Sequence, residues 1–298
     1  MVKKYLRLTK IVFEVLTTNP KIFFKRLFLL SKSAIFPVKE YPAQKNINGV
    51  IFKLDFEYCS PLKRMIYCNM YEVGVVEALK ASLRGGDTFI DVGANIGYIT
   101  AIGASLVGKK GRVYSFEPVP EYFSKLRNLA DLNKEYHIFA NQLAVSDRTG
   151  EEKMYLSDYS NIGANTMLSG LIGKKETRGS IFIKTCRLDE YIEKEKVENI
   201  KVIKIDTEGF EYLVLLGLKG FFNKCCLKGL LTPPLIICEI CPAAYQLLGY
   251  KVEDLFKYMK QFNYSPFSIL NPNKEISIER IKQESTINII FKSRPIKN

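Results

Sequence analysis

The chain of 298 residues carries 44 Lys and Arg against 31 Asp and Glu, which gives a formal net charge of +13. Hydrophobic residues make up 47% of it and charged residues 25%, values that exclude a disordered or fibrous protein and predict a sizeable buried core. The length fits one α/β domain with an extension. The sequence contains no run of about 18 uninterrupted apolar residues, which a membrane-spanning helix needs.

Seven cysteines at irregular spacing indicate reduced, buried thiols rather than a disulfide framework. Cys238 and Cys241 form a C-x-x-C pair, but the chain offers no second such pair, and its one histidine is His137. A structural zinc site is therefore disfavoured. Together with the absence of a convincing secretory cleavage motif, the thiols predict a cytoplasmic protein.

The N-terminal extension, residues 1–45, concentrates the positive charge. It holds ten Lys or Arg against Glu14 and Glu40, with Leu, Ile, Val and Phe interleaved at helical spacing. A basic amphipathic segment of this kind is typical of contact with an anionic membrane surface, here through residues 1–32 at the inner face. The alternative is a pair of helices that dock on the catalytic core with their basic side chains in solvent.

Residues 46–298 alternate between strand-like and helix-like patterns. Such alternation predicts a doubly wound, mostly parallel α/β sheet of seven strands, with an antiparallel edge near the C-terminus. Residues 151–188 break the alternation and predict a β-hairpin insertion beside the pocket. In chain order, we expect a helix at 72–83, a strand at 88–92, a helix at 98–106, a strand at 112–116, a helix at 120–132, a strand at 138–145, the insertion strands at 151–156 and 180–188, a strand at 201–206, a helix from 210, a strand at 235–240, a helix at 252–262 and edge strands at 265–270 and 286–291.

The turn after the first strand of this sheet predicts a cofactor site. Glycines there let the backbone approach a ligand, and the N-terminus of the following helix offers free N–H groups. Glu117, at the tip of the next strand, suits the hydroxyls of a ribose. The spacing departs from the G-x-G-x-x-G fingerprint, because Asn95 stands where its third glycine would be. Asp91 would repel a pyrophosphate and attract an ammonium group.

The pattern Asp91-x-Gly93-x-x-x-Gly97 followed by Glu117 resembles the S-adenosylmethionine pocket of class I methyltransferases. The alternative is an ordinary strand, turn and helix without a ligand. The pocket interpretation assigns Asp91 to the methionine ammonium, directly or through water, and Glu117 to the ribose. Gly93, Asn95 and Gly97 would shape the turn under the methionine portion, and Ala144 would face the adenine.

A second motif, Lys204-Ile205-Asp206-Thr207-Glu208-Gly209-Phe210-Glu211, makes the resemblance more specific. With the first motif and with Phe116-Glu117-Pro118, it is similar to the FkbM-type methyltransferases over about residues 71–264. The resemblance implies a class I fold, S-adenosylmethionine as methyl donor, and O-methylation of a hydroxyl. The acceptor it implies is a sugar, a glycan, a lipid-linked molecule or a secondary metabolite.

Three carboxylates are candidates for the chemistry. Asp206, at the end of a central strand, is the first choice for the base that takes the hydroxyl proton, and Glu208 is the second. Glu239 ends the adjacent strand and would complete a cluster, which could instead hold Mg²⁺, although no motif supports a metal. In the alternative without chemistry, Asp206 and Glu208 only cap the next helix. We expect Glu211 on the surface of that helix.

Two other functions stay open at this point. A nucleic-acid methyltransferase would suit the isoelectric point of about 9.2, but the segment Asp206 to Gly209 stands where base methylases carry an Asn/Asp-Pro-Pro-aromatic motif. Most of the excess positive charge also lies in the N-terminal extension, so nucleic acid is disfavoured as a partner. A non-catalytic binding protein is the other alternative, since a fold does not fix a function.

Overall fold

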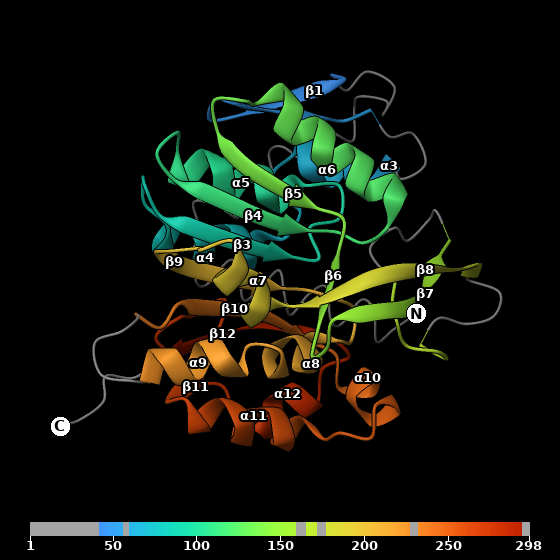
Figure 1. Ribbon diagram of the computed structural model, residues 1–298, viewed down its shortest axis with the longest axis vertical. Coiled ribbons are helices and arrows are strands. Elements are labelled where there is room, and N and C mark those ends of the chain that lie inside the picture. Colours follow the sequence, from blue (N-terminus) through green and yellow to red (C-terminus); the bar gives the residue numbers. More distant parts are fainter. Residues whose placement is uncertain (1–41, 56–59, 159–164, 172–176, 227–231, 294–298) are drawn as a thin grey trace.

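The computed structural model describes residues 42–55, 60–158, 165–171, 177–226 and 232–293 (Figure 1). The basic segment 1–32 and the rest of the chain up to residue 41 lie outside the described residues. No helix in the described ranges is long and apolar enough to cross a bilayer. All described cysteines are free thiols; four of them are buried, as the sequence predicts, whereas Cys226 and Cys241 are half-buried.

A seven-stranded sheet forms the centre of the protein, in the order β11-β12-β10-β9-β3-β4-β5. Neighbouring strands from β10 to β5 run parallel, whereas β12 is antiparallel to both β10 and β11. This confirms the predicted doubly wound, mostly parallel sheet with an antiparallel edge. The strand bounds, in chain order, are β3 Thr88–Val92, β4 Arg112–Phe116, β5 His137–Asn141, β9 Ile200–Ile205, β10 Leu235–Ile240, β11 Tyr264–Ser268 and β12 Ile287–Ser293.

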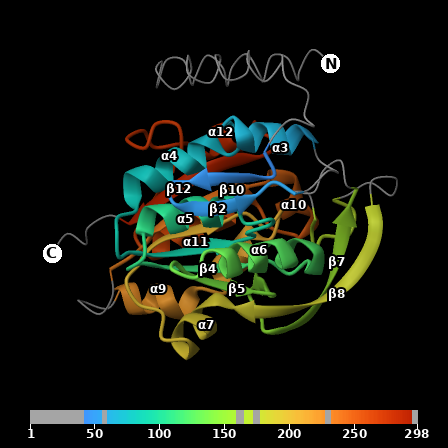
Figure 2. The ribbon, with the colours of Figure 1, turned by 90° about the horizontal axis from the view of Figure 1, so that it is seen from above.

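Helices connect the strands and pack on the sheet (Figures 1 and 2). α5 contacts β3 and β4, α6 contacts β5, α8 contacts β10, and α11 contacts β11. All five residues of β3 are buried, because a central parallel strand is covered on both faces. The helix bounds are α3 Ser60–Tyr67, α4 Val73–Ser82, α5 Tyr98–Val107, α6 Pro120–Leu132, α7 Leu188–Lys194, α8 Glu211–Leu216, α9 Lys219–Cys226, α10 Pro242–Leu247, α11 Val252–Gln261 and α12 Ile278–Lys282.

The insertion forms a second sheet, in the order β6-β8-β7. β7 (Gly150–Ser157) and β8 (Thr177–Arg187) are the predicted antiparallel pair, and Figure 1 shows them beside the end of the main sheet. The strand predicted over 138–145 is wrong in one respect. It divides into β5, which ends at Asn141, and β6 (Ala144–Ser146), which leaves the main sheet to pair with β8. Local apolar patterning does not reveal such a change of partner.

A hairpin precedes these elements and straddles the predicted boundary at residue 45. β1 (Gln44–Ile47) and β2 (Val50–Lys53) pair across a turn in which Asn48 and Gly49 both have positive φ. Asn-Gly suits such a turn, because both residues tolerate the left-handed conformation. Phe52 of β2 is 2% exposed, so the hairpin belongs to the packed domain.

Candidate functional site

A cleft with an empty volume of about 890 Å³ opens at the carboxyl ends of β3, β4 and β9. Open parallel sheets bind their ligands at this edge. The cleft is lined by six of the residues predicted for the site, namely Gly93, Asn95, Glu117, Ala144, Asp206 and Glu208. Asp91, Gly97 and Glu239 were also predicted for the site but do not line the cleft.

The glycine turn is shaped by close backbone contacts. Gly93 has φ 75°, and a Cβ there would overlap the carbonyl oxygen of Asp206. Gly97 has φ 87°, and a Cβ there would lie 3.0 Å from side-chain carbons of Leu126 and Leu129 on α6. Asn95 between them is also left-handed, with φ 51°. The first glycine thus lets the turns after β3 and β9 touch, and the second lets α5 begin close to α6.

Glu117 is locked in place at the end of β4. Its Oε2 accepts a hydrogen bond from the backbone N–H of Asn95 at 2.9 Å, and its Oε1 accepts one from Val119 at the same distance. The side chain is 5% exposed, and burial raises its pKa to about 7 against the effect of these two hydrogen bonds. Each oxygen keeps a lone pair that a ligand hydroxyl could use.

Asp91 is buried beneath the cleft wall. Its side chain is fully buried, and Oδ2 accepts a hydrogen bond from Thr100 Oγ1 at 2.7 Å. Its Oδ1 lies 3.5 Å from Nζ of Lys204. The carboxylate is not part of the cleft lining, and its contact with the methionine ammonium, directly or through water, stays a prediction. Lys204, which lies beside this carboxylate, is itself part of the cleft wall.

Lys204 is the residue that the sequence argument missed. Its side chain is 4% exposed and lines the cleft. Nζ donates to the carbonyl oxygen of Gly93 at 3.0 Å and lies 3.2 Å from Oδ2 of Asp206. Burial alone would lower the pKa of this ammonium, but the carboxylates of Asp206 and Asp91 outweigh burial and raise it. A lysine inside the apolar strand β9 was the available signal, because a buried lysine requires partners.

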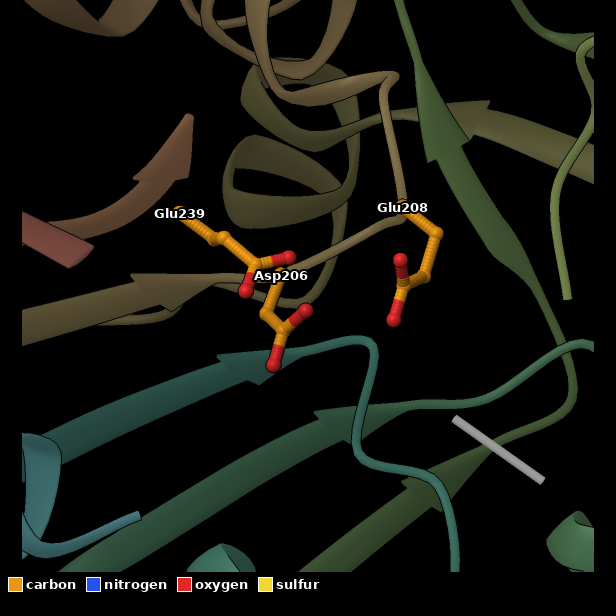
Figure 3. Close-up of side chains that lie close together, drawn as sticks. All are labelled: Asp206, Glu208 and Glu239. Carbon is orange, nitrogen blue, oxygen red and sulfur yellow. The ribbon is translucent and has the colours of Figure 1, made fainter. Parts of the chain in front are cut away.

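Asp206, Glu208 and Glu239 come together as predicted. One carboxylate oxygen from each lies within 4.8 Å of the others. Figure 3 shows Asp206 and Glu208 on the loop after β9 and Glu239 on β10. Burial, followed by the charge of Asp206, raises the pKa of Glu208 to about 9 and that of Glu239 to about 11. Oxygen ligands of this kind suit a divalent cation such as Mg²⁺, so the three residues could hold one.

The loop that carries Asp206 and Glu208 is held by Glu211. Glu211 accepts hydrogen bonds from the backbone N–H groups of Thr207 at 3.0 Å and Gly209 at 2.8 Å. It is fully buried, so its predicted place on the helix surface is wrong. The helix-cap alternative for Asp206 and Glu208 also fails, because α8 begins after Phe210 without a side-chain cap. Neither carboxylate therefore caps α8.

Two further parts of the wall come from outside the sheet. Glu72, before α4, adopts φ 49° and accepts a hydrogen bond from Asn288 Nδ2 at 3.4 Å. Burial raises its pKa to about 7, and the charge of Asp206 adds to the effect. The insertion contributes Met154 and Asn165, which confirms its expected place beside the pocket. Ala144 reaches the cleft because β6 leaves the main sheet.

The chain is similar in sequence and in structure to known methyltransferases. A "hexuronic acid methyltransferase AglP" from Haloferax volcanii is 30% identical over 147 residues, covering 49% of this chain and 56% of that protein. A protein-L-isoaspartate O-methyltransferase from Methanococcus aeolicus is 27% identical over 148 residues, covering 48% and 66%. The chain thus spans less than two thirds of either relative. A crystal structure of a methyltransferase FkbM from Methylobacillus flagellatus aligns with TM-score 0.42 and 15% identity, over 80% of this chain and 55% of that one.

The profile of the family described as "Methyltransferase FkbM domain" matches residues 91–266, more than half of the chain. The match begins at the buried Asp91 of β3, includes Glu117, Lys204 and the three clustered carboxylates, and ends within the edge strand β11. The chain therefore belongs to the FkbM methyltransferase family.

Proposed function

We propose that the protein is an S-adenosylmethionine-dependent O-methyltransferase that acts on a hydroxyl of a sugar, a glycan, a lipid-linked molecule or a secondary metabolite. The observation that carries the proposal is a single cleft whose lining includes Glu117 and the glycine turn together with Asp206 and Glu208. A relative named as a hexuronic acid methyltransferase supports a sugar-like acceptor.

The cofactor would be held by the turn after β3 and the end of β4. Gly93 and Asn95 leave the backbone open to the methionine portion, Glu117 would accept hydrogen bonds from the ribose hydroxyls, and Ala144 would lie against the adenine. Gly97 acts on this site through the packing of α5 on α6. When bound, S-adenosylmethionine supplies an activated methyl group to the acceptor oxygen.

Asp206 is the best placed base for the hydroxyl proton. The ammonium of Lys204 lies 3.2 Å from its carboxylate and holds it beside the cofactor turn. Glu208 and Glu239, with pKa values of about 9 and about 11, hold their protons at neutral pH and would act as hydrogen-bond donors or acceptors. Lys204 also bonds to Gly93, so one ammonium fixes the base relative to the cofactor turn. A positioned base of this kind contributes typically about 10²- to 10⁴-fold to the rate.

A calorimetric titration with S-adenosylmethionine tests the cofactor part of the proposal. Glu117→Gln should weaken binding by roughly 10- to 150-fold, because hydrogen bonds to a charged group contribute about 1.5–3 kcal/mol. Glu121→Gln is the matched control, since Glu121 lies on α6 and not in the cleft wall. A wild-type protein that does not bind the cofactor would refute the proposal.

The catalytic part is tested by methyl transfer to a panel of sugar, glycan and lipid acceptors. Asp206→Asn should retain cofactor affinity while turnover falls by about two or more orders of magnitude. If the three carboxylates hold Mg²⁺ instead, a chelator should abolish wild-type turnover and added Mg²⁺ should restore it. Near-normal turnover of Asp206→Asn, with no effect of chelator on wild type, would remove both roles from Asp206.

The N-terminal segment 1–32 supports a second, separate proposal about partners. Residues 1–45 hold ten Lys or Arg against two Glu, an excess of eight basic side chains, with apolar residues at helical spacing. Such segments bind anionic lipid surfaces through both their charge and their apolar face. We therefore propose a peripheral contact with the inner membrane face, where a lipid-linked acceptor would be within reach.

A further inference from the structure

Two residues of the cleft wall come from outside both the main sheet and the span that the family profile matches. Tyr71 and Glu72 line the cleft, but the match begins only at residue 91. α4 begins directly after them, at Val73. Neither residue takes part in the cofactor binding or the proton removal proposed above, so their place in the cleft calls for a role of its own.

Glu72 occupies a position that local structure disfavours for glutamate. It is the N-cap residue of α4, yet its side chain makes no capping hydrogen bond, and its backbone is left-handed, with φ 49° and ψ 45°. Asn or Gly would suit both the cap and the left-handed region at lower cost. In the described ranges, the other non-glycine residues at positive φ are five asparagines, Lys196 and Glu208. Neither the helix nor the turn therefore accounts for a glutamate here.

The carboxyl group of Glu72 is instead held beside the candidate base. Its Oε2 accepts a hydrogen bond from Nδ2 of Asn288 at 3.4 Å. Asn288 stands opposite Glu239 in the register of β10 and β12, and Glu239 has a carboxylate oxygen within 4.8 Å of one of Asp206. These contacts make Glu72 a neighbour of the group that would take the hydroxyl proton.

Tyr71 adds a hydroxyl group to the same wall. Its ring packs edge-on against Tyr98 with the ring centroids 5.8 Å apart, and Tyr98 packs in the same way against Phe52 at 5.7 Å. These contacts fix the position of the ring. Burial, and then the charge of Glu72, raise the pKa of the phenol well above its ordinary value of 10. The hydroxyl therefore stays protonated at neutral pH and is available as a hydrogen-bond donor.

We propose that Tyr71 and Glu72 bind a second hydroxyl of the acceptor, next to the hydroxyl that is methylated. A hydroxyl both accepts and donates hydrogen bonds, so the phenol of Tyr71 donates to its oxygen and the carboxyl of Glu72 accepts from its O–H. The acceptor is then a polyol with neighbouring hydroxyls, such as a sugar, rather than a molecule with one isolated hydroxyl. The inference rests on the proposed methyltransferase function.

Deoxy sugars test the pair directly. Methyl glycosides of glucose, galactose and mannose are assayed with S-adenosylmethionine, and the product shows which hydroxyl is methylated. The monodeoxy analogues that lack a hydroxyl on a neighbouring carbon are then compared with the parent sugar. In wild type, one of these analogues should lose roughly 3- to 10-fold or more in kcat/KM, because it leaves buried polar groups without their partner.

The same comparison in two variants assigns that loss to the pair. In Tyr71→Phe and in Glu72→Gln, the parent sugar should lose a similar factor in kcat/KM. The deoxy analogue should lose little more in either variant, because a hydroxyl and its hydrogen-bond partner act as one unit and their losses do not add. Tyr250→Phe is the matched control, since its ring packs edge-on against Tyr212 away from the cleft, and it should leave both sugars unaffected.

Stability and cofactor affinity separate this role from a structural one. Tyr71→Phe keeps the ring, so its melting temperature and its affinity for S-adenosylmethionine should match those of wild type. Glu72→Asn suits the cap and the left-handed turn, so its melting temperature should stay equal or rise by up to about 4 °C while KM for the sugar increases. Lys196→Asn is the matched control: Lys196 also has a positive φ, of 50°, but is exposed and outside the cleft. It should show the same thermal behaviour with unchanged kinetics.

Four results would overturn the inference. The first is a set of deoxy analogues that all react as fast as their parent sugars. The second is a loss in Tyr71→Phe or Glu72→Gln that adds in full to the loss from the missing hydroxyl. The third is a melting temperature lowered by more than about 4 °C, or weakened cofactor binding, in Tyr71→Phe or Glu72→Asn. The fourth is a set of glycosides that neither react nor bind, in calorimetry, to protein loaded with S-adenosylhomocysteine.

The cofactor titration keeps the two proposals apart. A protein that does not bind S-adenosylmethionine refutes the function itself. A protein that binds the cofactor and methylates a sugar, but shows additive losses, refutes only the role of Tyr71 and Glu72.

Discussion

Replacing Lys204 by Met tests whether one buried ammonium holds the two strand ends of the site together. Met keeps the length of the side chain and its apolar stem but removes the charge. The change removes the cation that lies 3.5 Å from Asp91, whose side chain is fully buried. It also removes the partner of Asp206, although that side chain is 23% exposed and water can replace part of the loss.

The expected cost follows from these burials. Removing one partner of a buried ion pair costs about 3–5 kcal/mol, and Asp91 accounts for most of it here. For a chain of this size, the melting temperature should fall by roughly 6–15 °C in scanning calorimetry at pH 8. Lys224→Met is the matched control. Lys224 pairs with Glu193 at 3.0 Å, but the side chains are 49% and 73% exposed, so the loss should not exceed about 1 kcal/mol.

The pH dependence of the Lys204→Met effect has a defined sign. Burial holds the pKa of Asp91 above its ordinary value of 3.8, and Lys204 opposes that rise. Without Lys204 the folded-state pKa increases further, so the folded variant binds a proton that the unfolded chain has released. Its stability then falls as pH rises through this window and recovers as pH decreases towards about 4. A variant within about 1 kcal/mol of wild type, or a deficit that grows in acid, would refute the central role of Lys204.

Three other outcomes are expected. Gly93→Ala should destabilise the protein by about 3 kcal/mol or more and abolish cofactor binding, because its Cβ meets a backbone carbonyl. Gly86→Ala, also at positive φ but in open space, should cost about 1–2 kcal/mol; equal losses in thermal denaturation would contradict the close contact. Burial raises the pKa of Glu117 and Glu211 from 4.5 to about 7, so their contribution to stability is lost as pH rises through that window. The melting temperature should therefore decline between about pH 5 and 8. A constant or rising melting temperature would count against the raised pKa values. Full-length protein should sediment with anionic vesicles at low salt and less at high salt. Deletion of residues 1–32 should abolish this binding but leave the affinity for cofactor unchanged. Full-length protein that does not bind the vesicles would favour the alternative in which the N-terminal helices dock on the catalytic core.

The order of the main elements could be predicted from the sequence because it rests on local patterns. β4, α6 and β10 lie at the predicted bounds, since each is an apolar or amphipathic run with clear flanking residues. The glycine turn was identifiable because Gly93 and Gly97 stand at fixed offsets from the end of β3 and from Glu117. The two motifs, taken together with Phe116-Glu117-Pro118, carried the resemblance that the family profile confirms.

Only the tertiary structure decided how the charged groups pair. Lys204 contacts Gly93, which is 111 residues away in sequence, because β9 lies beside β3 in the sheet. The burial of Asp91 and Glu211 likewise depends on the elements packed over them, so Glu211 lies in the interior although its motif predicted a surface position. A hydrophobic pattern records which face of an element is buried. It does not record which other element covers that face, and the partner of a charged group is set by that covering element.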